Sequence, residues 1–393
     1  LEAEVAEERK AHGYIWRNGE YLEEPIDGYG ALASMGGIFT TVEDLASWVG
    51  GFLDAFPPRD GPDITHPLSR ATRREMQQAS VPIGFRVTHP SSDATPDVEV
   101  MGYGYGLFTV DDARIGRVIG HGGGYPGFGT GMGWHPASGL GVIVLTNHRY
   151  GAATLLARDL LGELVRTAAA PIRRIRPNAA TEAARAAVEG LIDRWDDALA
   201  EGLFAMNVEL DEPLASRKAF VAELRERHGD LRRDEAEPVE SLTPFHAIWW
   251  LAGDRGRVRV EVLLSPELSP RVQTFAVTSV PESPTVLAAA ADRIVAAMQP
   301  PDSGPVVIDW PTELSLGTSV DIGAVVRAMR ATEARFGPIS LGPSTAGDGE
   351  TKATFRLESP RGRLELALEL DREAGCLSSV SIVPVKLVPP DLS

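Results

Sequence analysis

The stretch Ile119-Gly120-His121-Gly122-Gly123-Gly124-Tyr125-Pro126-Gly127-Phe128 decides the fold of the first part of this chain. It places one histidine before three glycines, between an apolar segment and a β-like run at 131–147. A strand gives up side-chain packing in this way where another group must approach its backbone closely. Exposed N–H groups on a strand edge can hold an oxyanion, and a histidine beside them can bind a carboxylate or relay a proton. The motif alone fits a glycine-rich β-turn with an incidental histidine equally well.

The flanking sequence favours a sheet. Upstream, 101–110 alternates as a strand does and ends at the turn Asp111-Asp112. Downstream, 135–139 is a turn by its Pro and Gly content, and 140–145 is an apolar run typical of a strand buried on both faces. Leucines at helical spacing then predict a helix over 150–166. The predicted order is strand, glycine-rich strand, strand, strand and helix.

A second block predicts the start of another helix: Ser34-Met35-Gly36-Gly37-Ile38-Phe39-Thr40-Thr41-Val42-Glu43-Asp44-Leu45-Ala46-Ser47-Trp48. Thr40 and Glu43 have the spacing of a capping box. The apolar residues that follow fall on one helical face: Leu45, Trp48, Val49 and Phe52.

Together the two blocks resemble the C-terminal part of the serine β-lactamase and penicillin-binding-protein-like hydrolases, in the branch of class C β-lactamases, D-aminopeptidases and related esterases. His121-Gly122-Gly123 is similar to the His-x-Gly triplet that this branch carries on the strand edging its active site. The Ser34 block is similar to the branch's "GG-(L/I)-x-(S/T)-T-x-x-D-(L/M)-A-x-W" stretch. The resemblance covers roughly residues 13–166, less than half of the chain.

The resemblance implies an enzyme that forms an acyl-enzyme from an amide or ester, such as a β-lactam, a D-amino-acid peptide or a small ester. His121 would bind the substrate carboxylate or support proton transfer, and Gly123 would permit close approach to the strand edge. The N–H of Gly124 would be one of two oxyanion donors, and we assign Gly122 and Tyr125 as substrate contacts.

The family's nucleophile and base are missing from this chain. In the family they form Ser-x-x-Lys, one helical turn that sets the lysine beside the hydroxyl. The four lysines are preceded three positions earlier by residues other than serine, namely Glu7, Ala215, Gly349 and Val383. The second motif, Tyr-x-Asn or Ser-x-Asn, is absent too. Both should precede Ser34, where only 33 residues remain, and the chain begins at Leu1, so truncation is the simplest interpretation.

We therefore expect the chain as it stands to be inactive and an N-terminal half carrying the nucleophile to be its partner. The alternative is a non-catalytic pseudoenzyme that serves as a binding or scaffolding protein. Other nucleophiles have little support. Ser34 is at most a substrate contact, Ser344 lies in a loop-like Gly/Pro/Ser stretch, and Cys376, the one cysteine, is expected to be a packed thiol.

The composition disfavours nucleic acid and a membrane as partners, which leaves a small-molecule or peptide substrate. A net charge of −17 disfavours nucleic acid, and no apolar run is long enough to span a membrane. The histidines lack metal-binding spacing and no phosphate-binding loop occurs, so we expect neither a metal nor a cofactor. No signal region opens the chain, but since the sequence looks truncated its absence says nothing about secretion. The location therefore stays open, with the cytoplasm slightly favoured over secretion.

The sequence predicts α/β and α+β folds in three domains. Residues 1–170 would be the C-terminal part of a β-lactamase-like fold, an antiparallel sheet with flanking helices, and 171–178 a linker bracketed by prolines. Ala252–Val260 recurs as Glu358–Leu366, which indicates two small α+β repeats, 179–284 and 285–393. Their helices are expected at 181–199, 216–228, 285–298 and 322–336, and Trp249, Trp250 and Phe275 in a core. No polar constellation recurs, so packing or partner binding is the favoured role of the repeats.

Overall fold

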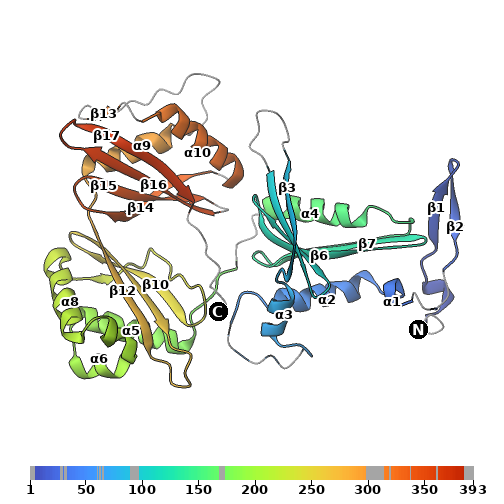
Figure 1. The fold of residues 1–393 in the computed structure, drawn as a ribbon, viewed down its shortest axis with the longest axis horizontal. Helices are drawn as coiled ribbons and strands as arrows, with labels where there is room; N and C mark the ends of the chain where they lie inside the picture. Colours follow the sequence, from blue (N-terminus) through green and yellow to red (C-terminus); the bar gives the residue numbers. More distant parts are fainter. Residues whose placement is uncertain are drawn as a thin grey trace. The chain divides into compact units, whose positions relative to one another are not determined.

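The computed structural model describes the chain except for residues 1–4, 27–29, 31–32, 60, 62, 64–65, 89–96, 168–172, 298–313, 318–319, 337, 360–361 and 385–393. It divides into two compact units, 1–173 and 174–393 (Figure 1). The sheets are antiparallel apart from one short parallel pairing, and helices flank them, so the predicted mixed α/β class is confirmed. The start of the predicted linker, 171–172, lies outside the described residues.

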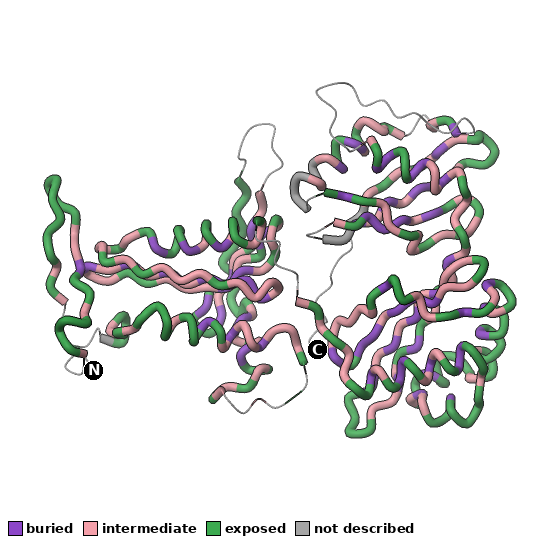
Figure 2. The backbone as a smooth tube through the Cα atoms, turned by 180° about the vertical axis from the view of Figure 1, so that it is seen from behind, coloured by how far each residue is buried: buried purple, intermediate pink, exposed green. Residues whose placement is uncertain are grey.

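The first unit is built on a six-stranded antiparallel sheet of order β3-β4-β5-β6-β7-β8. Its elements are the 3₁₀ turn Glu7–Arg9, β1 (Gly13–Arg17), β2 (Glu20–Glu24), α1 (Ala33–Gly36), α2 (Val42–Asp54), α3 (Arg70–Met76), β3 (Val81–Thr88), β4 (Asp97–Gly104), β5 (Leu107–Asp112), β6 (Gly116–Tyr125), β7 (Phe128–His135), β8 (Leu140–Thr146) and α4 (Ala153–Thr167). The hairpin β1–β2 forms a separate sheet and is almost wholly exposed or half-buried (Figure 2).

Helices α2 and α4 cover opposite faces of this sheet (Figure 1). On the α2 side, Phe52 stacks on Trp134 at 5.4 Å between ring centroids, and both are buried with Ile119. The indole N–H of Trp134 donates to Oε1 of Gln77. This hydrogen bond gives the buried indole nitrogen the polar partner that it needs away from water. The two sequence blocks therefore meet through a shared core, since Phe52 follows the first block and Ile119 begins the second.

Three local expectations for the first unit are wrong. The capping box is one residue later, because Thr41 caps α2 and its side chain pairs reciprocally with Asp44. The strand expected over 101–110 is two strands, separated by a tight turn at Tyr105-Gly106 in which both residues have positive φ. Strand β8 is only partly buried, since it is an edge of the sheet rather than a central strand.

The second unit contains two antiparallel sheets, each with its own helices (Figure 1). Its elements are α5 (Ala179–Asp193), α6 (Asp197–Leu203), α7 (Met206–Asp211), α8 (Leu214–His228), β9 (Arg232–Arg233), β10 (His246–Gly253), β11 (Gly256–Leu264), β12 (Val272–Pro281), α9 (Thr285–Ala296), β13 (Ser315–Leu316), α10 (Ile322–Phe336), β14 (Ser340–Gly347), β15 (Lys352–Ser359), β16 (Gly362–Asp371) and β17 (Cys376–Pro384). The sheet orders are β12-β11-β10-β9 and β13-β17-β16-β15-β14, with β13 parallel to β17.

Each sheet of the second unit has a separate hydrophobic core. Trp249, Trp250 and Phe275 are buried as predicted. The helix expected over 181–199 is two helices, α5 and α6, while the helix expected over 322–336 is α10 with the same bounds. The Gly342–Ala346 stretch lies in strand β14, so the loop predicted there is wrong. The tip of the second repeat hairpin, Pro360-Arg361, lies outside the described residues.

A buried ion-pair network connects these two sheets. Glu237 accepts hydrogen bonds from Arg257 at 2.9 Å and from Arg356 at 2.6 Å, and Arg356 comes from the second sheet. The side chains of Glu237 and Arg356 are each only 7% exposed. Burial alone would raise the pKa of Glu237, but the hydrogen bonds from the two arginines outweigh it and hold that pKa below its usual value.

Candidate active site at the glycine-rich strand edge

Strand β6 extends beyond its neighbour β5. The β5–β6 pairing ends at Phe108 and Gly120, whereas the β6–β7 pairing continues to Tyr125 and Phe128. Residues 121–124, which include the three glycines, therefore have a strand partner on one side only among the described strands. The other side of this segment is a free strand edge.

Local hydrogen bonds indicate which glycines face that edge. The hydroxyl of Thr130 on β7 donates to the carbonyl oxygen of Gly123 at 3.4 Å, and that of Thr146 on β8 donates to Gly129, the β7 partner of Gly124, at 3.0 Å. Backbone groups of successive strand residues point to opposite sides. The N–H and C=O of Gly124 therefore point away from β7, toward the free edge.

Two of the three glycines are also required by close packing. A Cβ on Gly122 would lie 1.9 Å from Oγ1 of Thr154 in α4, and one on Gly124 would lie 2.3 Å from the ring of Tyr150. A Cβ on Gly123 would meet only the hydroxyl end of Thr130, at 2.6 Å. Packing against Thr154 of α4 thus explains Gly122, and packing against Tyr150, in the segment before α4, explains Gly124, whereas neither explains Gly123.

His121 stands at the start of the free edge with both ring nitrogens engaged. Its Nδ1 lies 2.6 Å from the carbonyl oxygen of Gly122, and its Nε2 lies 3.2 Å from the hydroxyl of Tyr103 on β4. A carbonyl only accepts, so Nδ1 carries the hydrogen, and Nε2 of the neutral ring accepts from Tyr103. The ring of Phe108 adds a tilted contact at 5.4 Å between centroids. The site thus contains a linked tyrosine and histidine.

The first sequence block lies at the other end of the free edge. Helix α1 lies against β6, and a Cβ on Gly36 would sit 3.1 Å from the ring of Tyr125. Ser34, in the same helix, is exposed. The structure thus brings His121, Gly122, Gly123, Gly124 and Tyr125 together with the glycine pair of the Ser34 block.

The sequence predicts that residues 102–106 form an aromatic strand near the mouth of the site, but it does not assign Tyr103 itself to the site. The segment 102–106 is an obvious aromatic and glycine repeat, but nothing in the sequence pairs Tyr103 with His121. The other candidate nucleophiles belong to the second unit: Ser344 lies in β14, and Cys376 is half-buried in β17. Among the described residues, no cluster of three or more potential ligands could hold a metal ion.

Residues 2–166 match the family model described as Beta-lactamase. The match covers both sequence blocks and the whole glycine-rich edge, so this segment is similar to the β-lactamase family. The remaining residues, 167–393, lie outside the match.

One solved structure is similar over 96% of this chain, the octameric penicillin-binding protein homologue from Pyrococcus abyssi. The identity is 12% and the TM-score 0.30, and this chain spans 53% of that chain. No curated protein matches the chain. No helix among the described residues is long and apolar enough to cross a membrane.

Proposed function

We propose that residues 1–170 form one wall of the active site of a serine hydrolase that acts by an acyl-enzyme. The observation that carries the proposal is the free edge of β6, where the N–H of Gly124 is directed outward beside the Tyr103–His121 pair. The Beta-lactamase match over 2–166 supports the same reaction class.

The proposed step is attack by a serine oxygen on the carbonyl carbon of an amide or ester. As the new C–O bond forms, the electrons of the carbonyl double bond move onto oxygen, and the N–H of Gly124 stabilises that charge. Removing one such donor typically costs about 10²–10³ in rate. The proton of the serine hydroxyl passes to the external base as the C–O bond forms. Collapse then breaks the bond to the amine or alcohol, which leaves with a proton relayed in this proposal by the Tyr103–His121 pair. Alternatively His121, when protonated, binds a substrate carboxylate.

The proposal requires a nucleophile and base from outside this sequence, carried by an N-terminal half of the domain. The surface of the first unit supports such a partner. On β3, Phe85 is 75% exposed, and on α4, Leu155 is 63% exposed. Large exposed apolar areas and unpaired sheet edges mark interaction sites. The other exposed apolar residues of these two elements are Val81, Ile83, Val87, Leu156, Leu160 and Leu164.

The His-x-Gly triplet favours the class C, D-aminopeptidase and esterase branch, and hence a β-lactam, a D-amino-acid peptide or a small ester as substrate. The test begins with the chain itself, which is expected not to turn over nitrocefin or p-nitrophenyl acetate. A gene-encoded longer chain that contains an upstream Ser-x-x-Lys is expected to do so. Saturable turnover by the present chain, abolished by an acylating inhibitor, would point to another nucleophile.

In that longer chain, His121→Ala separates the two roles of the histidine. If the imidazolium binds a carboxylate, KM should rise for carboxylate-bearing substrates and hardly change for neutral esters. If the ring relays protons, kcat should fall for both, and Tyr103→Phe should alter the pH profile. A natural start near Leu1 together with no turnover would instead support the pseudoenzyme, a binding or scaffolding protein that keeps the fold.

A further inference from the structure

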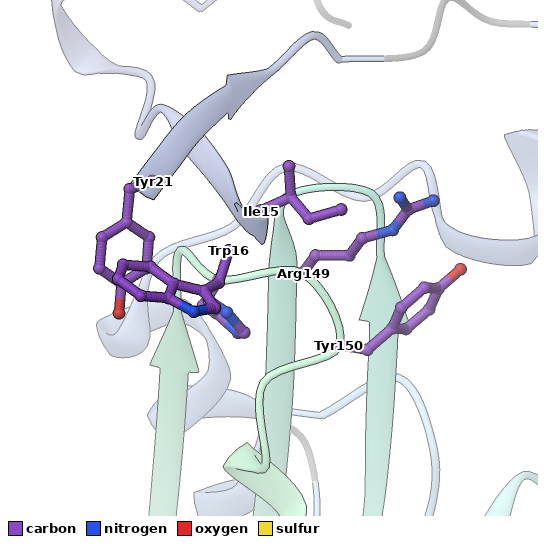
Figure 3. A pocket seen from close by; sticks show the side chains of 6 residues that line it. Ile15, Trp16, Tyr21, Arg149 and Tyr150 are labelled. Atoms are coloured by element: carbon purple, nitrogen blue, oxygen red, sulfur yellow. The ribbon is translucent and has the colours of Figure 1, made fainter. Parts of the chain in front are cut away.

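A pocket of about 580 Å³ lies between the β1–β2 hairpin and the segment that joins β8 to α4 (Figure 3). Its lining is mostly aromatic, with one guanidinium: Ile15, Trp16, Tyr21, His148, Arg149 and Tyr150. We call it the hairpin pocket. Its volume falls within the range of small-molecule sites, which are commonly aromatic with a few polar groups.

The two walls of the hairpin pocket are fixed to each other by backbone hydrogen bonds. The N–H of Tyr14 donates to Asn147 at 3.1 Å, and the N–H of Arg149 donates back to Tyr14 at 2.8 Å. Tyr150 has φ of 48°, a left-handed conformation that is costly for a non-glycine residue and is common at ligand sites. The pocket is therefore a built feature of the first unit.

The lining divides into an aromatic side and a cationic side, as Figure 3 shows. On the aromatic side the rings of Trp16 and Tyr21 meet edge to face at 4.7 Å, and His148 lies 6.1 Å from Tyr21. On the other side the guanidinium of Arg149 lies 5.7 Å from the centre of the Tyr150 ring. Trp16, Tyr21 and Tyr150 are each more than half exposed, so their ring faces are accessible.

Arg149 retains donors for a ligand. Its Nη1 pairs with Oε1 of Glu24 at 3.0 Å, and this is the one side-chain ion pair that the described residues give it. The pair is a single contact, because Oε2 of Glu24 is buried without a hydrogen-bond partner. A guanidinium has five N–H donors in a planar fork that matches a carboxylate. A second carboxylate can therefore bind alongside Glu24.

We propose that the hairpin pocket binds a small carboxylate that carries an aromatic ring, with the ring against Trp16 and Tyr21 and the carboxylate on Arg149. The proposal does not rest on the hydrolase function, because binding is measured without turnover. The pocket nevertheless adjoins the proposed active site. The ring of Tyr150 packs on Gly124, so a ligand held there lies at the end of the glycine-rich strand.

The test uses the full chain and ligand-observed NMR titrations with benzoate, phenylacetate and 3-phenylpropionate, each against its neutral amide. At least one acid is expected to bind saturably and about tenfold more tightly than its amide, as a hydrogen bond to a charged group implies. Arg149→Gln should remove that preference, whereas Trp16→Ala should weaken acid and amide alike.

Matched variants control for charge and fold. Arg17→Gln removes a cation from the same hairpin without touching the pocket lining, and Trp48→Ala removes a comparably exposed tryptophan from α2. Both should bind as the unmodified chain does. The proposal would be overturned if acids and amides bound equally, or if the preference for acids survived Arg149→Gln. It would also be overturned if the pocket bound a neutral sugar, methyl α-glucoside, in preference to the aromatic acids. The absence of binding by all three acids would likewise overturn it.

Discussion

The hydroxyl of Tyr103 lies 3.2 Å from Nε2 of His121, at the point where β5 ends and β6 continues with β7 as its one strand partner. The contact joins two strands that are not neighbours in the sheet, since β5 lies between β4 and β6. It can form only because β5 stops short. The same early end of β5 leaves the outward backbone groups of Gly122 and Gly124 without a strand partner. One feature of the topology thus creates both the Tyr–His pair and the free edge.

The first prediction concerns the hydrogen of His121. Because Nδ1 faces the carbonyl oxygen of Gly122 at 2.6 Å, the neutral ring should carry its hydrogen on Nδ1 rather than on Nε2. Long-range ¹H–¹⁵N NMR distinguishes the two tautomers, and the missing signal in His121→Gln assigns the residue. Tyr103→Phe should leave the tautomer unchanged, since it removes the partner of Nε2 only. A hydrogen found on Nε2 would contradict the hydrogen-bond assignment.

The second prediction separates structural from functional glycines. Alanine at Gly122 or Gly124 collides with Thr154 or Tyr150, and overpacking of this kind typically costs about 1–3 kcal/mol. Gly123→Ala should cost less than either, because only the hydroxyl end of Thr130 must move. Urea denaturation of the three variants measures the order. If Gly123→Ala were the most destabilising, the free edge would be a packing device and the site assignment would lose its support.

The sequence predicts the sheet around His121 because its cues are local. Glycine runs, alternation and leucine spacing act over a few residues, and they place β6, β7, β8 and α4 correctly to within a few residues. The resemblance of the Ser34 block to a known motif also puts it near the glycine-rich strand. The structure brings the two together through Phe52 and Ile119 in one core.

What the sequence could not predict depends on contacts between distant residues. The partnership of Tyr103 and His121 depends on where β5 ends, and no local pattern determines that end. The turn at Tyr105-Gly106 was missed because alternation continues on both sides of it. Gly342–Ala346 has a loop-like composition yet forms part of β14, where pairing with β15 outweighs local preference. The packing of Gly122 against Thr154 and of Gly124 against Tyr150 likewise depends on residues distant in the sequence.

The third prediction concerns pH and His228. The side chain is fully buried, and burial lowers its pKa below the usual value, while a hydrogen bond to the carbonyl of Arg255 opposes the shift only in part. In the unfolded chain the ring takes up a proton near its ordinary pKa of about 6.5. The contribution of His228 to the free energy of unfolding is therefore fully present above that pH. It decreases as the pH drops toward the lowered pKa of the folded state.

The measurement is the urea midpoint between about pH 7.5 and pH 5, where histidine titrates. His228→Gln should be less stable at neutral pH, because it loses the contact with Ser279 at 2.7 Å, yet its midpoint should change less with pH. His135, also buried and with a lowered pKa, provides the corresponding residue in the first unit. An unchanged pH slope in His228→Gln would mean that the residue does not contribute to the pH dependence.

The last prediction concerns the contact between the two sheets of the second unit. Arg356→Met leaves Glu237 buried with only Arg257 as its charged partner, and Glu237→Gln leaves Arg356 buried with only the more distant carboxylate of Glu358, at 3.7 Å, as a counter-ion. Breaking one side of a buried pair typically costs about 3–5 kcal/mol, and we expect about 3 for Arg356→Met because Arg257 remains. The double variant should lose less stability than the sum of the two single losses, since neither charge is then left without its partner.

Lys218 and Asp197, an exposed pair at 2.9 Å, are the matched control, and their removal should cost under about 1 kcal/mol. Urea denaturation of all the variants gives the coupling energy. Additive losses at Glu237 and Arg356 would show that the two sheets do not depend on this ion pair for their association.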